Sequence, residues 1–116
     1  MTPLLCRMLA AAAHHRASGV VPALLHNLWS GETHEFRREA DGFTDAQSGQ
    51  RAVQTAPDTV AIGAVSLRFT AIDDVAFAAR IEPSGESVTG RAGGGASVTL
   101  HHGEAFHQFA VAQAAA

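Results

Sequence analysis

The sequence predicts an α+β fold in which an N-terminal helix precedes an antiparallel meander of short strands. Near the N-terminus, apolar residues recur at helical spacing, whereas from residue 33 onward they alternate with polar residues, as in half-buried strands. Turn sequences such as Asp41-Gly42 and Pro83-Ser84-Gly85 separate these alternating runs. Because the sheet is the only large partner for the helix, we expect a curved sheet or partial β-barrel packed around it.

A chain of 116 residues has the size of one domain, and we place a helical region at 2–30 and a β region at 32–112. Thr2 is placed to cap the first helix, Pro3 suits its first position, and Gly19 is placed to end it. One face of this helix carries an apolar stripe, formed by Leu5, Met8, Leu9 and Ala12.

A second apolar group follows in the same region and predicts either a short helix after Pro22 or a bent continuation of the first helix. Ser30-Gly31 would end it. Its members are Val21, Leu24, Leu25, Leu28 and Trp29.

In the β region, period-two alternation and turn residues predict a series of short strands. The turns between them fall at Asp41-Gly42, at Asp73-Asp74 and at Pro83-Ser84-Gly85. The predicted strands cover residues 33–40, 51–55, 59–62, 64–70, 75–82 and 86–91.

Residues 97–111 predict a β-hairpin with His102-Gly103 as its two-residue turn. Pairing outward from this turn sets His101 opposite Glu104, Thr99 opposite Phe106 and Val98 opposite His107. We expect Leu100 and Phe109 on the buried face, and His101, Glu104 and Gln108 at least partly exposed on the other.

The composition excludes several classes of function. All eight basic residues are arginines, so a P-loop, Schiff-base chemistry and a biotinylated lysine are excluded within this chain. The arginines are scattered, which disfavours nucleic-acid binding. Cys6 is the single cysteine, so neither an intrachain disulfide nor a cysteine-based zinc site is possible. No apolar run is long enough for a membrane span, and Arg7 interrupts the N-terminal one, so we predict a cytoplasmic protein.

No complete catalytic, cofactor or metal motif is present, and we assign no residue to any of these roles. His101 and Glu104 lie close in the predicted hairpin, but His107 faces the other way, so three zinc ligands do not converge. The glycine-rich residues 90–95 lead into a strand rather than a helix, which disfavours a phosphate cradle. Asp73-Asp74 reads as an exposed turn, where both carboxyl groups ionise normally.

The segment from residue 77 to 111 resembles the end of the middle domain in α subunits of biotin-dependent acyl-CoA carboxylases of the methylcrotonyl-CoA and propionyl-CoA type. That domain commonly closes with a strand, a His/Asp-Gly turn and a strand rich in His and Phe. Here these are residues 98–100, His102-Gly103 and residues 105–109. The resemblance implies an N-terminal helix surrounded by an antiparallel barrel, and no catalytic residue within this piece.

The resemblance further implies a non-catalytic docking domain whose partner is the carboxyltransferase β subunit. From the residues themselves, the exposed face of the hairpin is the candidate contact surface, since an aromatic residue among polar ones is typical of interfaces. Its members are Thr99, His101, Phe106 and Gln108. Two alternatives remain open: a structural subunit of a larger assembly, such as a virion or shell component, and a small-molecule-binding β-barrel.

Overall fold

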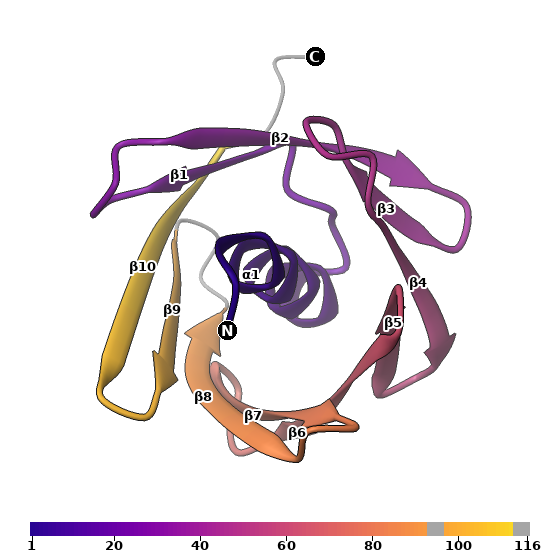
Figure 1. The fold of residues 1–116 in the computed structure, drawn as a ribbon, viewed down its shortest axis with the longest axis vertical. Coiled ribbons are helices and arrows are strands. Elements are labelled where there is room, and N and C mark those ends of the chain that lie inside the picture. Colours follow the sequence, from indigo (N-terminus) through magenta and orange to yellow (C-terminus); the bar gives the residue numbers. More distant parts are fainter. Residues whose placement is uncertain (93–96, 113–116) are drawn as a thin grey trace.

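A computed structural model describes residues 1–92 and 97–112 of the chain, and it confirms the α+β class with a helix placed inside a barrel. Figure 1 shows the helix α1 (Pro3–Ser18) in the centre of a ring of strands. The strands are β1 (Leu24–Asn27), β2 (Thr33–Glu39), β3 (Gly42–Asp45), β4 (Arg51–Ala56), β5 (Thr59–Ile62), β6 (Val65–Ala71), β7 (Ala76–Glu82), β8 (Glu86–Ala92), β9 (Ser97–His102) and β10 (Ala105–Ala112).

The barrel is fully closed, which corrects the expectation of a curved sheet or partial barrel. Each strand pairs antiparallel with its neighbours along the chain, and β1 closes the ring by pairing with β10. Leu25, for example, lies opposite Val111 of β10 on one side and opposite His34 of β2 on the other. Closure pairs the backbone of every strand on both sides and leaves no free sheet edge among the described strands.

The prediction of helix across residues 21–29 was wrong, so the helical region ends at Ser18 and not at residue 30. Leu24–Asn27 is the strand that closes the barrel. Its four residues carry too short a pattern to distinguish strand from helix, and the two neighbouring strands decide the outcome. Leu25 points into the core and is fully buried, whereas Leu24 and His26 lie on the outer side.

Strand β3 was absent from the prediction because Asp41-Gly42 looked like a turn. The turn lies one residue earlier, at Ala40-Asp41, and Gly42 begins β3. At this position β3 approaches β4 so closely that a Cβ on Gly42 would lie 1.8 Å from the carbonyl oxygen of Ala52. The glycine is therefore needed for close strand contact rather than for a turn.

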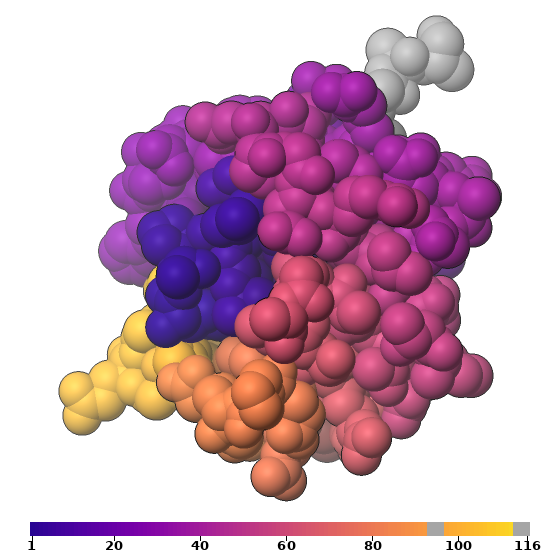
Figure 2. All heavy atoms as spheres, turned by 45° about the vertical axis from the view of Figure 1, so that its right-hand side comes forward, coloured from indigo at the N-terminus to yellow at the C-terminus, as the bar shows by residue number. Residues whose placement is uncertain are grey.

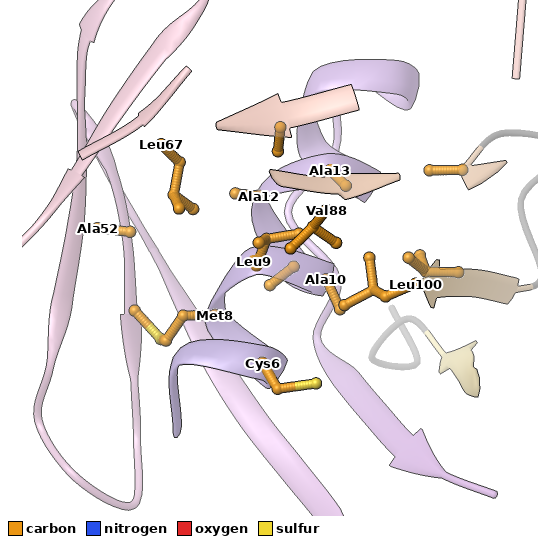
Figure 3. Close-up of a cluster of buried hydrophobic side chains, with 14 of the residues drawn as sticks. Cys6, Met8, Leu9, Ala10, Ala12, Ala13, Ala52, Leu67, Val88 and Leu100 are labelled. Carbon is orange, nitrogen blue, oxygen red and sulfur yellow. The ribbon is translucent and has the colours of Figure 1, made fainter. Parts of the chain in front are cut away.

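Helix α1 fills the barrel and is buried on all sides over its middle (Figure 3). Met8, Leu9 and Ala12 of the predicted stripe are buried, while Leu5 is only partly so. The alanines at positions 10, 11 and 13 are buried as well. An eight-stranded barrel is already wide enough for side chains to fill, so a ten-stranded one needs an additional core, and small side chains let a helix fit there.

The ends of α1 match the sequence signals. The Thr2 side chain accepts a hydrogen bond from the backbone N–H of Leu5 at 3.1 Å, and Gly19 takes the left-handed conformation that ends the helix. In Figure 2 the first residues of the chain, coloured indigo, reach the surface at one open end of the barrel. No helix among the described residues is long and apolar enough to cross a membrane.

A buried ion pair fastens the helix to the barrel wall. The Arg7 guanidinium contacts both carboxylate oxygens of Asp45, at 3.3 and 2.9 Å, and Ser48 donates to the same carboxylate from its backbone and hydroxyl groups. Burial of the Asp45 carboxyl raises its pKa, but the hydrogen bonds from Arg7 and Ser48 outweigh that effect and hold the pKa below its usual value. The carboxylate therefore stays charged inside the barrel at neutral pH.

Candidate functional site

The β9–β10 hairpin has a different register from the predicted one. His101 lies opposite Phe106 rather than Glu104, so the pairing is displaced by two residues. The turn is Gly103-Glu104. The φ angle of Gly103 is positive, at 60°, whereas that of Glu104 is not positive. Glycine at the first of two turn residues is typical of a II′ hairpin turn, which explains why the turn starts after His102.

A displacement by two residues keeps each side chain on its predicted face. Leu100 and Phe109 are buried, His101 and Glu104 are exposed and Gln108 is half-buried, so these burial predictions are confirmed.

All four candidate contact residues lie on the outer face of the barrel, on neighbouring strands. Thr99 of β9 lies opposite Gln108 of β10, and His101 lies opposite Phe106. The rings of His101 and Phe106 are in contact, with centroids 4.7 Å apart. Phe106 keeps 40% of its surface exposed. The structure thus brings the four residues together as one small surface with an aromatic centre.

Trp29 joins this surface, although the sequence interpretation placed it in the apolar group of a helix. It lies in the β1–β2 loop, is 71% exposed, and packs edge-on against Phe106 with ring centroids 6.4 Å apart. The backbone N–H of the neighbouring Leu28 donates to the carbonyl oxygen of Gln108, which holds the loop beside β10. We call Trp29, His101 and Phe106 the aromatic patch.

The loop that carries Trp29 has a recognisable sequence signal in Asn27 and Gly31. The Asn27 side-chain oxygen accepts hydrogen bonds from the backbone N–H groups of Trp29 and Ser30, at 2.9 and 3.1 Å. Gly31 has a φ of 77°, which favours glycine. Asn followed by Ser-Gly is typical of a turn, and weighing it above the leucines would have placed Trp29 in a loop.

Two histidines of the hairpin, His101 and His107, lie on opposite faces of the barrel wall. His101 faces outward, whereas His107 is on the inner face, opposite the buried Leu100. Burial, and then the neighbouring His102, lower the pKa of His107. Within residues 1–92 and 97–112, no three His, Cys, Asp or Glu side chains come close enough together to hold a metal ion.

Three other features considered from the sequence remain, namely Asp73, Cys6 and the glycine-rich residues 90–95. Asp73 accepts hydrogen bonds from the backbone N–H groups of Ala76 and Val75, which lower its pKa and hold the β6–β7 turn. Burial raises the pKa of the Cys6 thiol to about 11, so it stays protonated and unreactive. Of the glycine-rich segment, residues 90–92 belong to β8 and residues 93–95 lie outside the described part of the chain.

Hollows occur at both open ends of the barrel. At the end where α1 begins, a pocket of about 250 Å³ lies between Pro3, Asn27, His34 and His107. His34 is held there by Gln47, 3.1 Å from its Nδ1, and by Glu32, 3.4 Å from its Nε2. At the end where α1 stops, a more open cleft of about 480 Å³ includes His15. The aromatic patch lies nearer the first end, since its loop contributes Ser30 to the smaller pocket.

Comparisons of this chain with protein-family models, with curated proteins and with solved structures gave no match.

Proposed function

We propose that this chain is a non-catalytic docking domain of a biotin-dependent acyl-CoA carboxylase α subunit, and that it contacts the carboxyltransferase β subunit. The observation that carries the proposal is the aromatic patch, which lies exposed on the outside of a barrel whose interior is occupied. Exposed tryptophan and phenylalanine side chains that contact each other are typical centres of binding energy in protein interfaces.

The architecture supports the carboxylase assignment. A central helix inside an antiparallel barrel is the arrangement that the resemblance of residues 77–111 implies. The hairpin that carries the resemblance also carries Phe106 and His101. Resemblance and surface chemistry therefore point to the same part of the molecule.

The barrel interior argues against the small-molecule-binding alternative. Ligand-binding barrels keep a cavity at their centre, whereas α1 fills the centre here with Met8, Leu9 and its alanines. The shell-component alternative predicts self-assembly of the isolated chain, which light scattering or sizing chromatography would reveal.

Docking is tested by pull-down of purified carboxyltransferase β subunits with this chain. Trp29→Ala and Phe106→Ala should each weaken binding by at least tenfold, since losing a central aromatic anchor typically removes about 2 kcal/mol or more of binding energy. His101→Ala should weaken binding less, because its ring supports that of Phe106.

The matched control is Ile72→Ala, which removes an apolar side chain that is 62% exposed but lies in the β6–β7 turn. It should leave binding unchanged. Equal losses for Ile72→Ala and Trp29→Ala would contradict the aromatic patch, and absence of binding to every β subunit would contradict the carboxylase assignment.

A further inference from the structure

The cleft at the end of the barrel where α1 stops is lined by an exposed arginine, Arg38. Along β2 the buried His34 and Phe36 define the inner side, and Arg38 continues that side at the barrel mouth. Arg38 lies opposite Phe43, which is also buried. Arg38 lines the cleft together with His15 of α1.

Arg38 has no carboxylate partner among the described residues. Two acidic residues line the same cleft, but each is engaged on the outer side of the barrel. Glu39 accepts a hydrogen bond from the hydroxyl of Thr44 at 3.0 Å, and Asp41 pairs with Arg51 at 3.1 Å. Asp58 lines only the adjoining hollow, where Thr59 donates to it at 2.9 Å.

The positive charge of Arg38 acts on His15. Burial is the largest cause of the lowered pKa of His15, and the charge of Arg38 lowers it further. An anion between these two groups would offset the repulsion. Arg16 lines the adjoining hollow and adds a further positive charge, with its guanidinium 5.9 Å from the ring centre of Phe69.

We propose that this cleft binds a small molecule through a phosphate or carboxylate group held by the guanidinium of Arg38. Arginine presents paired N–H donors that match the oxygens of both groups. The volume of about 480 Å³ is within the usual range for small-ligand sites and exceeds the space needed for the anionic group alone. Gln54 and Thr55 line the cleft beside it and offer uncharged polar groups for the rest of the ligand.

The site lies at the opposite end of α1 from the pocket beside the aromatic patch, so it does not depend on the docking proposal. Its test uses the isolated chain with inorganic phosphate or acetate as probe, up to tens of millimolar, against chloride at the same ionic strength. The readout is the protonation midpoint of His15, followed by NMR.

We expect phosphate, acetate or both to raise the His15 midpoint relative to chloride, because a bound anion compensates the charge of Arg38. A response to phosphate alone assigns a phosphorylated ligand, and a response to acetate alone assigns a carboxylate. In Arg38→Gln the midpoint without probe should be higher and the response to the probe should be lost.

The matched control is Arg37→Gln, which removes the same side chain from the adjacent position on the outer face of β2. It should keep the full response. The proposal is overturned if neither probe moves the His15 midpoint, or if Arg37→Gln and Arg38→Gln abolish the response alike. Unchanged histidine resonances elsewhere, together with the thermal midpoint, verify that both variants fold.

Discussion

At the scale of single residues, the Arg7–Asp45 ion pair joins the helix to the barrel wall. Its two residues are 38 positions apart, and the Asp45 side chain is fully buried. Replacing Arg7 leaves that carboxylate without its partner. We therefore expect Arg7→Met to lower the free energy of unfolding by about 3–5 kcal/mol, measured by urea denaturation.

The control for this prediction is Arg37→Met, an exposed arginine whose loss should change stability by less than about 0.5 kcal/mol. The double variant R7M/D45N should regain part of the lost stability, because it removes the unpaired charge. If R7M/D45N is no more stable than R7M, the loss comes from packing of the arginine side chain and not from charge.

His14 is another buried titratable group of the fold. It is 2% exposed, and its Nδ1 has no hydrogen-bond partner within the described part of the chain. Burial, and then the adjacent His15, lower its pKa in the folded chain. The unfolded chain therefore binds protons more readily at this residue than the folded chain does. The folded state keeps its full stability above the ordinary histidine pKa of the unfolded chain, and it loses stability as the pH falls from there through the lower pKa of folded His14.

We predict that the free energy of unfolding decreases from pH 7 to pH 5 and that His14→Leu reduces this slope. One differential proton corresponds to a slope of about 1.4 kcal/mol per pH unit. His15 and His107 have lowered pKa values too, so some slope remains. His101→Gln changes an exposed histidine and serves as control; an identical slope in wild type and His14→Leu would contradict the prediction.

At the scale of elements, α1 acts as the core of the barrel. Leu9 is fully buried, so Leu9→Ala should cost about 2–5 kcal/mol of stability, read from the denaturation midpoint. Leu28→Ala removes the same groups from a side chain that is 49% exposed, and it should have little effect. Equal midpoints for Leu9→Ala and wild type would exclude a packed helix.

The elements that were predictable from sequence are those with strong local signals. Both ends of α1 were predicted correctly from the signals at Thr2, Pro3 and Gly19. Strand β5 was predicted with the bounds that the structure has, Thr59–Ile62. Leu24–Asn27 was missed because its strand state depends on β10, which lies far along the chain. Because this strand was predicted as helix, Trp29 was not recognised as a loop residue. The sequence therefore located the outer face of the hairpin, but not the Trp29 side chain that lies beside it.

At the scale of the whole molecule, closure of the sheet restricts how the protein can meet a partner. The described strands have neighbours on both sides, so a partner cannot add a strand to an edge. Contacts must use side chains on the outer wall or at the two mouths. This is why the aromatic patch and the Arg38 cleft, one on each type of surface, are the candidate sites of the molecule.

The pairing of β1 with β10 also has a consequence during protein synthesis. The helix leaves the ribosome before the strands of its barrel, yet its cover is complete only when β10 has joined β1. Until then the apolar side chains of Met8 and Leu9, which are buried in the folded protein, are not fully covered in the nascent chain. Exposed apolar surface of this kind is what chaperones bind. Translation must therefore pass β10 before the barrel can close, and a chain cut short within β10 would leave its core exposed.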